Sequence, residues 1–243
     1  MSLLSSLESY WALDETSGSR ADSHGTNTLT SNGGVGSATG KISNGADFEP
    51  LSSQYLSQTS SASLQTSDID FTFSFWFRLE VAATGYIIIG KDTDTPGSSR
   101  DYTIDVDGVG PKLRFFINGG DAIVESSTSL VQDTWYFAVC WHDESANTLN
   151  LRLDNGTPVS SSTGGAVPQT SSAEFRIGAR QYSGFEGYMR GLIDEVGFWK
   201  RELDSSEQSE LWNSGNGLAY SSFSAGGGSV VPLFMNQYRQ RVA

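Results

Sequence analysis

Cysteine, histidine and basic residues are scarce in this chain, and long apolar runs are missing. The 243 residues include two histidines and one cysteine, Cys140. A single cysteine excludes an internal disulfide framework. Two histidines and one cysteine are also too few to build a typical zinc site. No stretch reaches the roughly 18 consecutive apolar residues that a membrane-spanning helix needs, so we expect no membrane insertion.

The charge balance and the N-terminus narrow the classes of function further. Lys and Arg number 15 against 28 Asp and Glu, a formal charge of −13. Phosphates would be repelled, so we expect no nucleic-acid partner, whereas cations would be attracted. Residues 1–7 show neither the basic region nor the long apolar region of a secretory signal. These features predict a location in a virus particle, with an extracellular location as the alternative.

The abundant residue types are those typical of short strands and turns. Glycine, serine and threonine are frequent and 12% of the residues are aromatic. In residues 71–79 phenylalanines occupy one face of a strand, and Trp76 lies on the opposite face. Residues 113–117, 135–141 and 149–153 alternate in the same way. Strands at this spacing predict a two-sheet sandwich.

Two local signals predict a hairpin and a helix. Asp154-Asn155-Gly156 is typical of a two-residue hairpin turn. A helix is expected to begin near Asp204 or Ser205, with Glu207 or Gln208 completing a capping box and Gly215 as its stop.

The order of these segments resembles the laminin-G-like, concanavalin A-like jelly rolls. The closing segment Gly191-Leu-Ile-Asp-Glu-Val196 and the later Leu203-Asp-Ser-Ser-Glu207 are similar to that family's final strand and turn. Tyr10-Trp-Ala-Leu-Asp-Glu15 and Phe71-Thr-Phe-Ser-Phe-Trp76 resemble its opening and central strands. The resemblance covers roughly residues 8–213. It implies an all-β, two-sheet antiparallel jelly-roll sandwich with one short C-terminal helix.

The resemblance also implies a structural Ca²⁺ site. Related jelly rolls often hold Ca²⁺ with a loop near the first strand and the Asp of the closing strand. The matching positions here are Asp22, Asn27 and Asp194. The alternative is that Asp22 and Asn27 form Asx turns and that Asp194 accepts hydrogen bonds from backbone amides.

Catalysis is not expected. Jelly-roll glucanases similar to this fold use a Glu-x-Asp-x-x-Glu strand, and Leu192-Ile-Asp194 lacks the first glutamate. Cys140 and His142 lie two residues apart, but their strand is strongly apolar, which favours a structural cysteine. His24, in a loop of glycine and asparagine, is expected at the surface.

A ligand would be recognised by rim loops or by a sheet face. The loop of residues 180–187 offers Arg180, Tyr182 and Phe185 beside flexible glycines, and Trp76 is a second aromatic candidate. Alternatively, these aromatic residues pack in the core or cover the edge of a sheet.

The C-terminal end differs from the body. We expect a jelly-roll domain over residues 1–222, a Gly/Ser linker over 223–229 and an extended anchoring tail over 230–243. Residues 223–243 contain two arginines and no acidic residue, a charge of +2, against 13 basic and 28 acidic residues, −15, in the remainder. The expected anchoring residues are Val231, Leu233, Phe234, Met235, Arg239 and Arg241.

Three functions are consistent with these observations. The first is a non-catalytic surface component of a phage particle, a capsid decoration or tail-associated appendage. It would be present in many copies or as a homo-oligomer, with the tail bound to other subunits and the jelly roll displayed to cell-surface glycan. The second is a carbohydrate-binding module of an extracellular protein, and the third, disfavoured, is a glycoside hydrolase.

Overall fold

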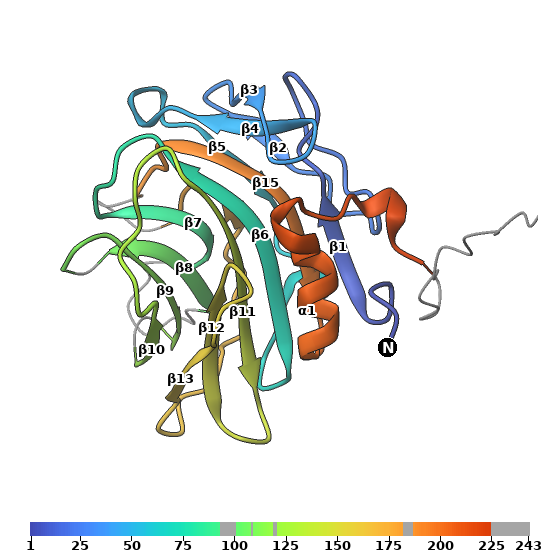
Figure 1. Cartoon of the computed structure of the whole chain (residues 1–243), viewed down its shortest axis with the longest axis vertical. Coiled ribbons are helices and arrows are strands. Elements are labelled where there is room, and N and C mark those ends of the chain that lie inside the picture. The colour runs from blue at the N-terminus through green and yellow to red at the C-terminus, as the bar shows by residue number, and fades with distance from the viewer. Residues whose placement is uncertain (93–100, 108, 119–120, 182–186, 225–243) are drawn as a thin grey trace, which may run out of the picture.

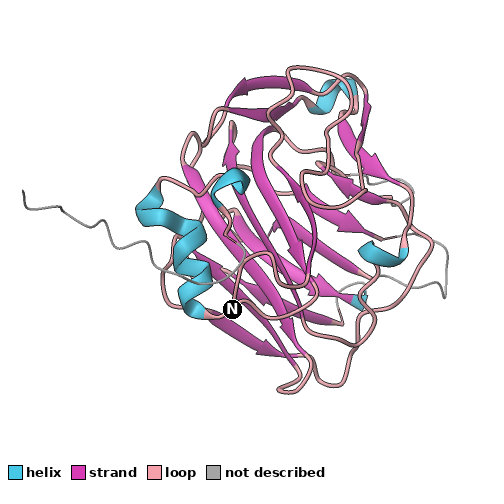
Figure 2. Cartoon of the chain, turned by 90° about the vertical axis from the view of Figure 1, so that its right-hand side faces the viewer, coloured by secondary structure: helices cyan, strands magenta, loops and turns pink. Residues whose placement is uncertain are grey.

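Two antiparallel β-sheets face each other and enclose the apolar stripes that the alternating segments predict (Figure 1). The computed structural model describes residues 1–92, 101–107, 109–118, 121–181 and 187–224. Figure 2 shows that strands make up most of the fold and that the few helices are short. The predicted all-β sandwich with one short helix is confirmed.

In both sheets neighbouring strands often come from distant parts of the sequence. The first sheet has the order β13 (Val159–Ser162), β12 (Thr148–Leu153), β11 (Trp135–Asp143), β6 (Phe71–Leu79), β15 (Gly191–Trp199), β4 (Asn44–Phe48) and β3 (Gly36–Thr39), and β1 (Leu7–Trp11) also pairs with β15. The second sheet has the order β10 (Ala122–Glu125), β9 (Lys112–Ile117), β8 (Tyr102–Asp107), β7 (Tyr86–Lys91), β14 (Phe175–Ile177), β5 (Tyr55–Gln58) and β2 (Thr30–Asn32). The described helical segments are η1 (Pro50–Ser52), η2 (Ala62–Leu64), α1 (Ser205–Trp212), η4 (Asn213–Gly215) and η5 (Tyr220–Ser222).

The phenylalanines of β6 form the centre of the core between the sheets. Phe71, Phe73, Phe75 and Phe77 are completely buried there, and the ring of Phe73 stacks on Phe198 of β15 with centroids 4.5 Å apart. Burial of this apolar surface is the main force that holds the sheets together. Cys140 is part of the same core, and burial raises the pKa of its thiol, as expected for a structural cysteine.

A second apolar cluster covers the outer face of the first sheet. It joins the N-terminal segment, α1 and η5 to that face, and Figure 1 shows α1 lying against it. The indole Nε1 of Trp199 donates a hydrogen bond to the carbonyl of Leu3 at 2.7 Å. The cluster consists of Leu3, Leu7, Tyr10, Trp76, Phe137, Val139, Trp141, Trp199, Leu203, Leu211 and Phe223.

The helix and the hairpin follow their local signals. Asp204 caps α1 and forms the predicted capping box with Glu207. The helix stops at Asn213, whose φ of 46° places it in the left-handed region, and not at the expected Gly215. In the hairpin turn Asp154 and Asn155 both have positive φ, as the Asp-Asn-Gly sequence predicts.

The prediction that Trp76 is an exposed sugar platform is wrong. Only 2% of Trp76 is exposed, because Trp212 of α1 stacks on it with centroids 5.2 Å apart. The ammonium of Lys41 lies 4.3 Å from the ring centroid. The alternative that the sequence left open, an aromatic residue under a covering layer, is the one observed.

No helix in the described ranges combines the length and apolar character needed to cross a membrane.

Candidate functional site

The loop between β14 and β15 is anchored at both ends on β7. Gly178 donates a backbone hydrogen bond to Ile88 at 2.9 Å, and Ile87 donates to Gly187 at 2.7 Å. Met189 closes the loop by donating to Gly178 at 2.8 Å. We call the described part of this loop, residues 178–181 and 187–189, the anchored loop. Tyr182 and Phe185, two of the predicted ligand residues, lie outside the described residues.

Arg180, the third residue predicted in this loop, lies directly on the outer face of the second sheet. A methyl group added to Gly90 of β7 would lie 2.8 Å from the Cβ of Arg180. Such a contact is too close for carbon atoms, so a glycine at this position is what allows the loop to approach β7. The Arg180 guanidinium lies 3.8 Å from the carboxylate of Asp92, which follows β7.

Strand register extends this face across the whole second sheet. Residues that pair from one strand to the next form a single row across this face. Gly90, in the middle of the row, has no side chain, and Arg180 lies over the space that this leaves. From one edge to the other the row consists of Thr30, Ser57, Arg176, Gly90, Thr103, Phe116 and Ile123.

Acidic and basic side chains pair beside this row. Arg114 of β9 binds both carboxylate oxygens of Asp105 on β8, at 2.8 and 2.6 Å, and also contacts Asp107 at 2.8 Å. Burial raises the pKa of Asp105, and the hydrogen bonds from Arg114 oppose that change. The same carboxylate raises the pKa of Arg114. These bonds hold the charged groups in fixed positions.

Aromatic surface lies on the other side of Arg180. The guanidinium of Arg176 lies 4.3 Å from the ring centroid of Tyr55 on β5. Tyr188 of the anchored loop lies 6.3 Å from the same ring. Arg176 also donates a hydrogen bond to the carbonyl of Arg180 at 3.2 Å, so the aromatic group and the anchored loop are joined.

The surface that we call the recognition face consists of Tyr55, Asp105, Arg114, Arg176, Arg180 and Tyr188. It combines hydrogen-bond donors and acceptors at fixed positions with two tyrosine rings. Such a combination suits a ligand that carries many hydroxyl groups on an apolar ring. The pairing of Asp105 with Arg114 follows from the register of β8 and β9, in which Asp107 is opposite Lys112; the sequence reasoning did not identify it. The contact of Arg180 with Gly90 has no local signal.

The proposed calcium ligands are engaged by the protein itself. Asp22 accepts hydrogen bonds from the amides of Tyr10, His24 and Gly25 with Oδ1 and from Asn27 with Oδ2. The side chain of Asn27 bonds to serines through both its oxygen and its nitrogen. These bonds are what the Asx-turn alternative describes, and they leave Asp22 and Asn27 poorly suited to a cation.

Asp194 is different, because one of its oxygens has no hydrogen-bond partner among the described residues. Its Oδ2 accepts from the amides of Lys41 and Ile42 at 2.7 and 2.9 Å, while Oδ1 is buried without a partner. Burial raises the pKa of Asp194 to about 7. The adjacent Glu195 is also buried, and burial and the charge of Asp194 raise its pKa to about 8, against the effect of a hydrogen bond from Tyr10.

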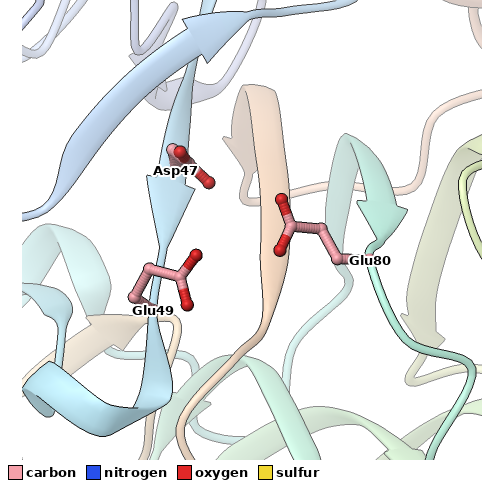
Figure 3. Close-up of side chains that lie close together, drawn as sticks. All are labelled: Asp47, Glu49 and Glu80. Atoms are coloured by element: carbon pink, nitrogen blue, oxygen red, sulfur yellow. The ribbon is translucent and has the colours of Figure 1, made fainter.

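An acidic cluster that the sequence reasoning missed lies elsewhere on the first sheet. Figure 3 shows the carboxylates of Asp47 and Glu49 facing that of Glu80 across β15. Oxygens of the three side chains lie within 4.8 Å of one another, a spacing that a hard cation could bridge. Burial first, and then its acidic neighbours, raise the pKa of Glu80, while Arg190 and Arg78 oppose them. The cluster depends on β4 and β6 flanking β15, which no local pattern reveals.

The predicted anchoring residues Val231, Leu233, Phe234, Met235, Arg239 and Arg241 lie outside the described residues. Phe223, expected to open the linker, instead packs on Tyr10 with centroids 5.0 Å apart. The folded domain therefore includes Phe223. The carbonyl of Ser224 accepts a hydrogen bond from the hydroxyl of Ser2.

Comparison with known proteins finds one family model that matches this chain and several solved structures that share its fold. A family model described as the concanavalin A-like lectin/glucanases superfamily matches residues 51–207. Among curated protein sequences none matches the chain.

Solved structures share the fold at low sequence identity. Domain 4 of AbnA, a GH43 extracellular arabinanase from Geobacillus stearothermophilus in complex with arabinotriose, is 17% identical, with a TM-score of 0.62 over 84% of this chain and 97% of that domain. The binding domain of Paraclostridial Mosquitocidal Protein 1 is 17% identical, with a TM-score of 0.66 over 87% of this chain and 53% of that one. Trypanosoma rangeli sialidase in complex with sialic acid is 15% identical, with a TM-score of 0.62 over 88% of this chain and 34% of the sialidase. The chain thus spans about half of the toxin domain and a third of the sialidase.

Proposed function

Because this chain belongs to the concanavalin A-like lectin/glucanase superfamily, we propose that it is a non-catalytic recognition module that binds carbohydrate on the recognition face. The observation that carries this proposal is the position of Arg180. Arg180 lies over Gly90 of β7, with Arg176 and Tyr55 on β14 and β5 to one side and Asp105 and Arg114 on β8 and β9 to the other. A sugar bound there would lie near charged hydrogen-bonding groups and a tyrosine ring.

Two further observations support a binding role. The arabinanase domain that shares this fold over nearly its whole length was solved with arabinotriose. The closing strand β15 also lacks the paired carboxylates expected of a retaining or inverting glycosidase, since Leu192 stands where the first glutamate would be.

Substitution of Arg180 tests this function directly. In glycan-array binding followed by calorimetry, Arg180→Ala should weaken binding about tenfold or more, because a charge-assisted hydrogen bond is lost. Arg180→Lys should restore it only in part, since a lysine lacks the planar fork. Gly90→Ala should also weaken binding, because the added methyl group displaces the anchored loop without changing any charge.

The matched control is Arg190→Ala. Arg190 is 46% exposed and pairs with Glu80 of the acidic cluster, away from the recognition face. Equal glycan affinity for the wild type, Arg180→Ala and Gly90→Ala would contradict the proposed site. Failure of the wild type to bind any arrayed glycan would contradict the function.

We also propose that residues 230–243 attach the domain to a larger assembly, such as the surface of a phage particle, so that the jelly roll is displayed. The support is that the folded domain closes at Phe223, leaving an apolar and basic segment beyond the described residues. Removal of residues 225–243 should abolish incorporation into the assembly. Full incorporation of the shortened chain would contradict the anchor.

We also propose a structural calcium ion at Asp194, whose Oδ1 has no protein partner among the described residues. The measurement is the unfolding temperature in CaCl₂ and in EDTA, with Asp194→Asn as the variant. Identical unfolding temperatures in both solutions would contradict a calcium site.

A further inference from the structure

The two sheets meet at an open edge beside β9, the strand that carries Arg114 of the recognition face. β10 is the last strand of the second sheet and β13 the last strand of the first, and Figure 1 shows them close together. The core cluster reaches this edge through Leu153 and Val159, which are only partly buried. The edge therefore exposes part of the hydrophobic interior.

A pocket of about 320 Å³ lies at this edge. Its aliphatic floor consists of Leu151 and Leu153 of β12 and Val159 of β13. Its rim comes from the turn that follows β10 and from the hairpin between β12 and β13. The rim turn is held in place, since the hydroxyl of Ser126 donates to the carbonyl of Thr128 at 2.9 Å and accepts from the amide of Leu113 at 3.2 Å.

The rim hydroxyls are available to a ligand. Ser127, Thr128 and Thr157 line the pocket, and all three residues are exposed. Within the described ranges no hydrogen bond to protein involves these three hydroxyls. Each can both donate and accept, so the rim can serve a ligand that carries adjacent hydroxyl groups.

The lining also excludes several ligand classes. None of its residues is charged, so nothing there would compensate the desolvation of a carboxylate, sulfate or phosphate. None is aromatic, so a sugar cannot pack its ring face on a flat π-surface as it can on the recognition face. The volume is at the small end for ligand sites, which suits a single small ring.

We propose that this pocket binds one neutral 6-deoxyhexose unit, with its C6 methyl group on the aliphatic floor and its ring hydroxyls at the rim. This class supplies the two features that the pocket requires, a compact methyl group and adjacent hydroxyl groups. The site is separate from the recognition face, so the chain would hold a glycan at two places.

The test uses a pair of sugars that differ only at C6. In saturation-transfer NMR with the full-length chain, methyl α-L-fucopyranoside should bind with a dissociation constant on the order of millimolar, with the strongest transfer to its methyl group. Methyl α-L-galactopyranoside, which carries a hydroxyl at C6, should bind about tenfold more weakly, because its hydroxyl would lie unpaired on the floor.

Two tryptophan substitutions locate the binding. Thr157→Trp should fill the pocket and abolish fucoside binding, whereas Ser160→Trp, at an exposed position of β13 that does not line the pocket, should leave it unchanged. Unfolding temperatures of both variants show whether each is folded. Arg180→Ala should not alter fucoside binding, which separates this proposal from the recognition face.

Four results would overturn the proposal. They are equal binding of the two sugars, binding of cyclohexanol at the pocket without either sugar, loss of fucoside binding in Arg180→Ala, and no transfer from the protein to either sugar. The last result leaves glycan binding on the recognition face unaffected, because that site is tested separately with Arg180.

Discussion

Glu195 combines a buried carboxyl group with a backbone conformation that side-chain-bearing residues rarely adopt. Its φ is 51°, and the pairing of β15 with β6 shifts register between Asp194 and Gly197. This bulge places two successive carboxyls in buried positions, both with raised pKa values. Folding therefore favours the protonated form of each group.

The sign of the resulting pH dependence follows from these pKa values. An unfolded glutamate has a pKa of about 4.3, and the folded value for Glu195 is about 8. The folded state therefore binds more protons between these values, so stability present at low pH is lost as the pH rises toward the folded pKa. We expect the free energy of unfolding to fall by roughly 2 kcal/mol or more between about pH 5 and about pH 8.

The variant Glu195→Gln tests this assignment, because it keeps an acceptor for Tyr10 and removes the titrating proton. Its free energy of unfolding, measured in denaturant, should depend less on pH than that of the wild type. Glu144→Gln, at an exposed turn, is the control and should retain the wild-type slope. An unchanged slope in Glu195→Gln would show that Glu195 is not responsible.

At the scale of elements, α1 shows how a short helix is held in place by its first turn. The helix has eight residues, too few to be stable alone in water. Its capping box satisfies backbone amides at the start, and the Arg201 guanidinium binds the carboxylate of Glu207 with distances of 2.6 and 2.7 Å. The helix then brings Trp212 over Trp76 and so closes the outer face of the first sheet.

Removal of the cap should loosen this layer. Asp204→Ala should lower the free energy of unfolding by about 1 kcal/mol, the usual cost of losing an N-cap side chain, and Asp204→Ser should restore most of it. The measurement is equilibrium unfolding followed by tryptophan fluorescence. Glu210→Ala, an exposed position on the same helix, is the control, and a loss equal to that of Asp204→Ala would contradict the role of the cap.

At the scale of the whole molecule, the two ends of the domain close on each other. Tyr220 and Phe223 pack on Tyr10 of β1, and His24 contacts the Tyr220 hydroxyl at 3.0 Å. The N-terminal amine also lies 3.6 Å from the Glu207 carboxylate of α1. The folded unit therefore depends on residues up to Phe223.

Two truncations separate the domain from its tail. A chain ending at Ser224 should keep the unfolding temperature of the full chain, because its domain contacts are intact. A chain ending at Ala219 loses Tyr220 and Phe223 and should be destabilised by about 2 kcal/mol or more, as expected for lost aromatic packing. Equal stability of the two truncated chains would show that η5 contributes little.

The sequence by itself determined the strands, the turn residues and the capped helix, because each depends on neighbours a few residues away. The phenylalanine alternation of β6 and the Asp204–Glu207 spacing are signals of this kind. Tertiary structure alone decided which surfaces remain accessible. Trp76 is covered by Trp212, Arg180 lies on Gly90, and Asp47 faces Glu80 across β15. Each of these contacts joins segments distant in sequence, and the order of strands that creates them is set by burial of the whole core rather than by any local pattern.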